Sequence, residues 1–153
     1  MIINYSLDSI TKLSFTLKIR GYISLLKLRL SSLVVMSAFF GFLLADGNLT
    51  SYIFLNLILG GVLITGSSNG FNQIIEYKTD ELMSRTFSRP LPSKVLSIPE
   101  ALTFCIITGV LGLYLLASIN FSSFILGLLA MVIYTVIYTP LKKITPFAVF
   151  VGA

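Results

Sequence analysis

The sequence predicts an all-α integral membrane protein, built as a multi-helix transmembrane bundle. Of its 153 residues, 56% are hydrophobic and only 11% are charged, with a mean hydropathy of +0.94. Soluble domains carry about 25% charged residues. The apolar residues form four long runs, each near the roughly 20 residues that a helix needs to cross a bilayer. The Lys and Arg residues fall only in alternate connections between these runs, which is the pattern of a multi-pass chain.

The first apolar run covers residues 22–45 and follows an N-terminal arm at residues 1–21. We expect the arm to form a short amphipathic helix on the membrane surface. An Asp-Gly-Asn turn at 46–48 ends the first run, and the second covers residues 52–75. The second run contains Gly, Ser and Asn residues. Small residues let helices approach closely and polar ones need partners, so this helix is predicted to lie in the protein interior.

The segment 97–100 reads Ser-Ile-Pro-Glu, in which Ser is a helix cap, Pro an early helical residue and Glu a first-turn acid. It predicts the start of a third span over residues 101–118. A fourth span over residues 121–139 follows a short connection. Another apolar run begins near residue 146 and is too short to cross a bilayer. We therefore expect four spans and the truncated start of a fifth, in the N-terminal part of a longer protein.

The eleven basic residues also predict the orientation in the membrane. Five lie in the arm and at the start of the first run, four in the connection between the second and third runs, and two after the fourth. Cytoplasmic connections carry the excess of Lys and Arg, so the N-terminus and the second-to-third connection are predicted to be cytoplasmic. This distribution accounts for the net charge of +5, so we expect no nucleic-acid partner. With no His and one Cys, the chain has no Ser-His-Asp triad, zinc cluster or disulfide framework.

A polar stretch between the second and third runs holds the candidate site. Asn72, Glu76 and Asp80 are spaced i, i+4, i+8, so on a helix they share one face over roughly 12 Å. Asn69 joins the same face. Two carboxylates with amide oxygens suit Mg²⁺, which prefers to share phosphate oxygens with one or two carboxylates.

Two arginines follow the acidic residues, and they indicate which anion would bind together with the magnesium. Arg85 and Arg89 are four residues apart and precede a helix stop at Pro90. Arginine suits bidentate recognition of phosphate. An acidic face followed by two arginines indicates a site for a magnesium-bound diphosphate. A solvated cytoplasmic loop with ordinary surface pairs, such as Glu81 with Arg85, accounts for the same spacing, and spacing alone leaves both interpretations open.

The longer motif runs in the order Asn72-x3-Glu76-x3-Asp80-x2-Met83-x-Arg85-Thr86-x2-Arg89-Pro90-Leu91-Pro92. It resembles the first acidic motif of the UbiA-type intramembrane prenyltransferases, and more narrowly that of the protoheme IX farnesyltransferases (haem O synthases) among them. Segments 26–30 and 138–146 are also similar, and the resemblance runs from about residue 23 to 153. The sequence departs from the family at Leu28, where Pro is common, and at Lys94, where Gly is usual.

The resemblance implies a nine-helix bundle with a cavity open to the cytoplasm and to lipid, in a bacterial inner membrane. It implies Mg²⁺ that bridges farnesyl diphosphate to two acidic motifs, ionisation of the allylic C1–O bond, and capture of the farnesyl cation by a vinyl group of haem B. Carried over, Asn72, Glu76 and Asp80 would hold the metal and the diphosphate. Arg85 and Arg89 would stabilise the leaving group's charge. Further candidate substrate contacts are Asn69, Lys27, Arg29, Lys142, Lys143 and Tyr138.

The candidate substrate contacts outside the motif also fit purely structural roles. Interfacial anchoring accounts equally for the four basic residues, and aromatic packing accounts for Tyr138. The family's second Asp-rich motif and its histidine-bearing later helices do not occur in these 153 residues. The resemblance therefore implies an N-terminal half that is inactive alone. The alternatives are a prenyltransferase acting on an aromatic quinone precursor, a small cation or proton transporter using Glu76 and Asp80, and a non-catalytic membrane partner.

Overall fold

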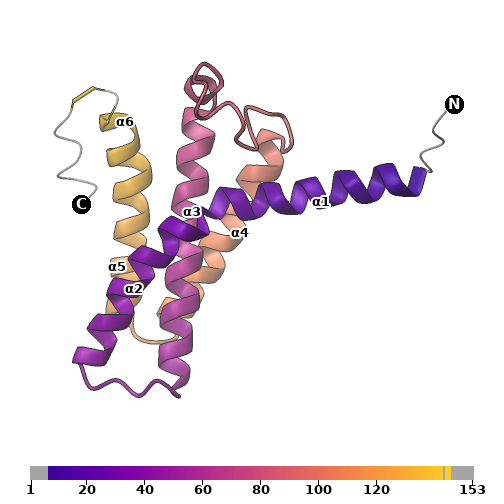
Figure 1. Cartoon of the computed structure of the whole chain (residues 1–153). Helices are drawn as coiled ribbons and strands as arrows, with labels where there is room; N and C mark the ends of the chain where they lie inside the picture. The colour runs from indigo at the N-terminus through magenta and orange to yellow at the C-terminus, as the bar shows by residue number, and fades with distance from the viewer. Residues whose placement is uncertain (1–6, 143, 146–153) are drawn as a thin grey trace, which may run out of the picture.

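The computed structural model describes residues 7–142, 144 and 145, with side chains from residue 15 onward, and the regular elements in this part of the chain are all helices. The elements are, in order, α1 (Leu7–Leu26), α2 (Leu28–Leu44), α3 (Tyr52–Glu81), α4 (Ile98–Ala117), α5 (Phe121–Val132), the π-helical η1 (Ile133–Tyr138) and α6 (Thr139–Leu141). The last three follow one another as a single rod (Figure 1). The prediction of an all-α fold is confirmed.

Three helical segments are long and apolar enough to cross a membrane, namely Tyr52–Glu81, Ile98–Ala117 and Phe121–Leu141. The pair Phe15–Leu26 and Leu28–Leu44 makes a fourth if the bent pair counts as one span. This agrees with an integral membrane bundle of about four spans. The apolar run from residue 146, predicted to start a fifth span, lies outside the described residues.

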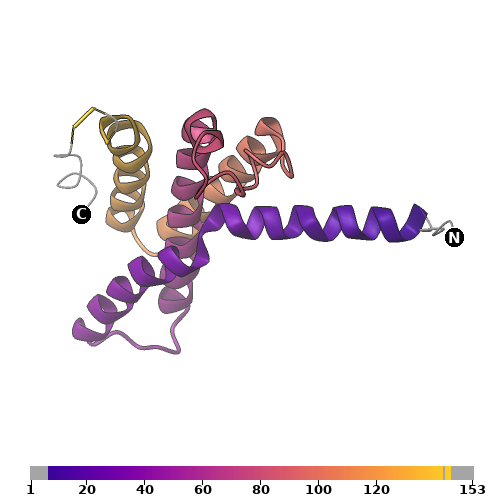
Figure 2. The ribbon, with the colours of Figure 1, turned by 45° about the horizontal axis from the view of Figure 1, so that its top comes forward.

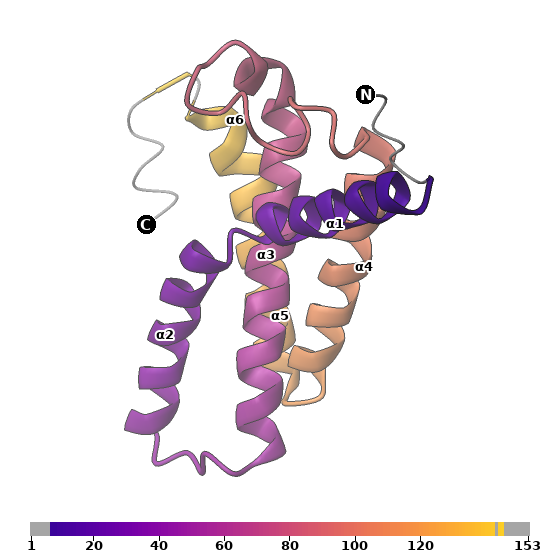
Figure 3. The same ribbon diagram turned by 45° about the vertical axis from the view of Figure 1, so that its right-hand side comes forward.

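The first predicted span is not one straight helix. It is divided at Lys27, where the chain bends by 40° between α1 and α2. No break occurs near residue 21, where the arm was predicted to end, because α1 continues to Leu26. Figures 1 and 2 show α1 projecting sideways from the bundle, and Figure 3 shows it crossing α3 and α4.

The helix α3 is the centre of the bundle and packs against α1, α2, α4, α5 and η1. Residues 66–70 are all buried, as the composition of this run predicted. Glycine allows the close approach of α4: a Cβ at Gly70 would lie 2.3 Å from Cys105 Sγ, and one at Gly112 would lie 3.0 Å from the Ile64 backbone nitrogen. The interior position predicted for this helix is therefore confirmed.

The connection between α3 and α4 packs onto the end of α1. Leu91 and Leu96 from this connection form a buried cluster with Leu25 of α1 and Ala101 of α4. The connection then enters α4 at Ser97, the helix cap that the Ser-Ile-Pro-Glu order predicted, and Glu100 completes a capping box there. This cluster fixes the connection beside the C-terminal third of α3, where the acidic residues lie.

Candidate functional site

The acidic face of α3, which we define as Asn72, Glu76 and Asp80, lies in the last three turns of the helix. The predicted second span ended at residue 75, whereas α3 continues to Glu81 and carries this face as regular helix. Asn72 and Asp80 are buried, and the Glu76 side chain is only 12% exposed. Carboxylates with so little access to water need charged or hydrogen-bonding partners.

Lys142, just after α6, supplies one such partner. Its Nζ donates to Glu76 Oε2 and to Asn72 Oδ1, both at 2.9 Å. Thr139 Oγ1 lies 3.1 Å from the same Asn72 oxygen and 2.9 Å from the Tyr134 carbonyl, and these two acceptors share its one hydroxyl proton. The rod begins at Phe121, well after the acidic face in sequence, and its end closes over that face and neutralises Glu76.

The π-helical turn η1 orients two aromatic rings at this end of the rod. Tyr134 and Tyr138 are four residues apart, and their rings stack with centroids 5.0 Å apart. Lys142 Nζ lies 5.4 Å from the centre of the Tyr138 ring. Such π-helical turns occur frequently at functional sites. The stacked rings form an aromatic wall next to the Lys142–Glu76 pair.

Arg89 supplies the partner of the other carboxylate. Its Nη1 donates to Asp80 Oδ2 at 2.5 Å, and the Asp80 side chain is 7% exposed. Thr86 Oγ1 donates to the Asp80 carbonyl at 2.8 Å, so the connection folds back onto the end of α3. Each carboxylate of the acidic face is therefore paired with a cation from a different segment.

The two motif arginines do not act as a pair in this structure. The helix α3 ends at Glu81, so Arg85 and Arg89 are not on one helix as their spacing suggested. Arg85 is exposed and forms no ion pair with any described residue. The alternative pair with Glu81 does not form either. Only Arg89 is held at the acidic face.

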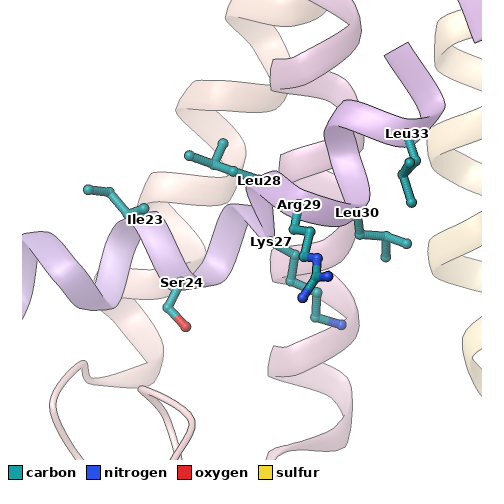
Figure 4. Close-up of a pocket in the computed structure, with 7 residues that line it drawn as sticks. All are labelled: Ile23, Ser24, Lys27, Leu28, Arg29, Leu30 and Leu33. Atoms are coloured by element: carbon teal, nitrogen blue, oxygen red, sulfur yellow. The ribbon is translucent and has the colours of Figure 1, made fainter. Parts of the chain in front are cut away.

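Lys27 and Arg29 lie at the break between α1 and α2, beside a groove of about 510 Å³ with walls of Ile23, Leu28, Leu30 and Leu33. Figure 4 shows both cationic side chains directed to the same side of the break, with Leu28 on the opposite side. Lys27 is close enough to interact electrostatically with Arg89, Lys142, Asp80 and Glu76. Lys27 therefore joins the charges of the site, whereas Arg29 is exposed.

Asn69 lies one turn before the acidic face and is buried between helices. Its amide donates to Ser31 Oγ of α2 at 3.5 Å, and it accepts from Tyr134 OH at 3.5 Å. These contacts join α2, α3 and η1 below the site, and they give Asn69 interhelical partners. Lys143, the last predicted contact, lies outside the described residues.

Sequence reasoning assigned no role to three polar residues that shape the site: Gln73, Thr86 and Thr139. Gln73 Nε2 donates to the Leu25 carbonyl at 3.1 Å, across the boundary between α1 and α3. Thr86 and Thr139 hold the connection and the rod as described above. Each is a buried polar residue within or beside an apolar segment, and that was the signal available in the sequence.

The donor set fits a magnesium ion that shares phosphate oxygens. The described residues contain no group of three or more His, Cys, Asp or Glu side chains, so they form no closed metal cage. Two carboxylates and the Asn72 amide oxygen lie in line instead, and such a set suits Mg²⁺ that keeps water and phosphate ligands. The cations of Arg89 and Lys142 lie next to these oxygens, where a bound polyanion needs countercharge, and Lys27 lies within electrostatic range.

The sequence of this chain is similar to those of known proteins. Residues 34–153 match the model of the UbiA prenyltransferase family. The chain is 42% identical over 136 residues to the protoheme IX farnesyltransferase of Cytophaga hutchinsonii, covering 88% of this chain and 48% of that protein. It is 43% identical over 127 residues to the enzyme of that name from Christiangramia forsetii, covering 83% and 42%.

A more distant relative is the mitochondrial protoheme IX farnesyltransferase of Arabidopsis thaliana, which is 40% identical over 138 residues, covering 88% of this chain and 32% of that protein. The chain thus spans less than half the length of these three relatives. No solved structure matches the chain.

Proposed function

This chain belongs to the UbiA prenyltransferase family, and from that premise we propose that it contributes to a farnesyl transfer from farnesyl diphosphate to a vinyl group of haem B, which produces haem O. Relatives that carry the name protoheme IX farnesyltransferase support this choice of substrates. The single observation that carries the site assignment is the acidic face itself. Its two carboxylates share one side of α3, and each has a cation within hydrogen-bond distance.

Under this proposal, Asn72, Glu76 and Asp80 would hold Mg²⁺. When bound, the ion supplies positive charge that makes diphosphate a better leaving group. The protein's own cations act on the same charge: Arg89 and Lys142 lie beside the carboxylates and have further N–H donors that can bind phosphate oxygens.

The aromatic wall gives the reacting carbon an apolar boundary. The stacked rings of Tyr134 and Tyr138 flank the Lys142–Glu76 pair. Ring faces attract a cation and exclude water, so they would protect an allylic cation until the vinyl group captures it. Phosphate recognition and carbon chemistry would thus occupy adjacent parts of one site.

The membrane would separate the apolar and the charged parts of the substrate. The farnesyl chain is apolar and would lie in the bilayer, while the diphosphate and Mg²⁺ would arrive from the cytoplasm at the connection between α3 and α4. We place the N-terminus and this connection on the cytoplasmic side, as the Lys and Arg distribution predicts, and we propose that the membrane is a bacterial inner membrane. The matched stretch covers less than half of each of these relatives, so a second acidic motif is expected outside this chain. The chain alone is expected to be inactive.

The test is haem O formation by the full-length protein in membranes supplied with labelled farnesyl diphosphate and haem B. Glu76→Gln and Asp80→Asn should each abolish the product while the protein still inserts. Asp46→Asn is the matched control, because Asp46 is exposed in the turn between α2 and α3. Substantial haem O from either site variant would refute the assigned roles. Transfer to 4-hydroxybenzoate instead of haem would assign the protein to the quinone branch of the family.

A further inference from the structure

We infer that Gln73 is a positioning residue, which holds the break between α1 and α2 and thereby sets the place of Lys27 and Arg29 relative to the acidic face. The contact itself is independent of any function. Its consequence for diphosphate rests on the proposed function above.

The break removes the normal partners of two backbone carbonyls. In a continuous helix, the carbonyls of Leu25 and Leu26 would accept from the N–H groups four residues later. Here the Leu30 N–H donates to the Lys27 carbonyl at 2.8 Å, and the Ser31 N–H donates to the same carbonyl at 3.0 Å. Buried carbonyls in a membrane protein must find other donors.

Side chains supply these donors. Gln73 Nε2 of α3 donates to the Leu25 carbonyl at 3.1 Å, and Ser31 Oγ donates to the Leu26 carbonyl at 2.8 Å. Gln73 is 2% exposed and Leu25 is 0% exposed, so water cannot replace the bond between them, and the Ser31 side chain that donates to Leu26 is also fully buried. Asn69 donates to Ser31, so α3 supports both carbonyls, one directly and one through Ser31.

The backbone at Lys27 depends on this support. Its φ of 45° and ψ of 54° lie in the left-handed region, which is unfavourable for residues other than glycine. Such a conformation persists when the surrounding structure determines it. The bond from Gln73 is accepted by the Leu25 carbonyl, two residues before Lys27. It joins the side chain of an α3 residue to the backbone of α1 next to the break.

Gln73 and its neighbour Asn72 thus fix two flanks of one site. Asn72 accepts from Thr139 and Lys142, which hold the rod on one flank. Gln73 fixes the break on the other flank, from which Lys27 interacts with the charges of Asp80 and Glu76. Two consecutive residues of α3 therefore set the distance between cations that arrive from opposite ends of the chain.

The experiment measures the geometry of the break directly in the full-length protein in lipid nanodiscs. Spin labels replace Phe15 in α1 and Leu33 in α2, which are 67% and 68% exposed, and Cys105→Ala removes the buried thiol. Gln73→Met keeps the side-chain length and removes the donor. We expect the interlabel distance distribution to shift or broaden. Asn56→Leu, which removes the bond from Asn56 to Ser118 at the other end of α3, should leave it unchanged.

Ser31→Ala provides a second variant if Gln73→Met does not fold. It removes the donor to the Leu26 carbonyl with little change in volume, and it should shift the same distance in the same direction. An unchanged distance in the folded variants would overturn the inference.

Binding of inorganic diphosphate with Mg²⁺, followed by calorimetry, tests the consequence for the site. Gln73→Met should weaken diphosphate binding about tenfold, because roughly one charge-assisted hydrogen bond to the phosphate would be misplaced. A changed distance with unchanged diphosphate affinity would overturn the positioning role. If the wild-type protein binds no diphosphate, the proposed function fails, while the interlabel distances still decide whether Gln73 holds the break.

Discussion

The pair between Lys142 and Glu76 joins the end of the rod to α3, and its removal should be measurable as stability. Lys142→Met removes the charge and leaves Glu76, whose side chain is 12% exposed, without its cation. Glu76→Gln removes the opposite charge. We expect each single change to lower the free energy of unfolding, and the double change to cost clearly less than the sum of the two.

The size of this coupling follows from the geometry. Unit charges 2.9 Å apart attract by about 6 kcal/mol at an effective dielectric constant near 20. Desolvation offsets much of this attraction, since both groups are withdrawn from water. The Lys142 side chain is 29% exposed and also donates to Asn72. It therefore keeps contact with water and with Asn72 when the Glu76 charge is removed, which lowers the expected coupling. We therefore expect a coupling of about 2 kcal/mol, within the range found for contacting residues.

The assay is a double-mutant cycle on the purified chain in detergent micelles, with unfolding followed by circular dichroism against denaturant. The pair of Lys18 with Glu100, whose side chains are 44% and 34% exposed, is the matched control and should show a much smaller coupling. Additive effects at Lys142 and Glu76 would refute the reasoning, because they would mean that the two groups do not interact in the folded protein.

Three further changes test the packing and the connection. Gly70→Ala places a Cβ 2.3 Å from Cys105 Sγ and should destabilise the chain by about 1–3 kcal/mol, with partial rescue by Cys105→Ala in denaturant titrations. Thr86→Val removes the bond to the Asp80 carbonyl and should cost about 1 kcal/mol in the same assay; no change would argue against that bond. Arg85→Ala should alter stability by less than about 0.5 kcal/mol, because Arg85 is exposed, yet weaken diphosphate binding in calorimetry; equal affinity would exclude Arg85 from the site.

The helices and the acidic face could be predicted because their signals are local. Apolar runs bounded by turns indicate membrane helices. The spacing of Asn72, Glu76 and Asp80 places them on one face as soon as the segment is helical. The Ser-Ile-Pro-Glu order similarly indicated the start of α4, and the capping box at Ser97 has the expected bonds.

The break at Lys27 and the partners of the carboxylates could not be predicted in this way. No local sequence signal marks a lysine in the left-handed region. The conformation of Lys27 depends on the bond from Gln73 to the nearby Leu25 carbonyl, and these two residues are 48 positions apart in the sequence. Lys142 is 66 residues from Glu76, and only the packing of the rod brings them together. The four-residue spacing of Arg85 and Arg89 suggested one helical face, and this was wrong because α3 ends before either residue.

The most direct test of the central claim is the Mg²⁺-dependent binding of farnesyl diphosphate by the full-length protein. We expect the combined Glu76→Gln and Asp80→Asn changes to weaken this binding by at least about tenfold, since both carboxylates proposed to bind the metal are lost, while the control Asp46→Asn binds like the wild type. Equal affinity in the folded double variant and the wild type would contradict the claim that the acidic face of α3 holds the magnesium diphosphate.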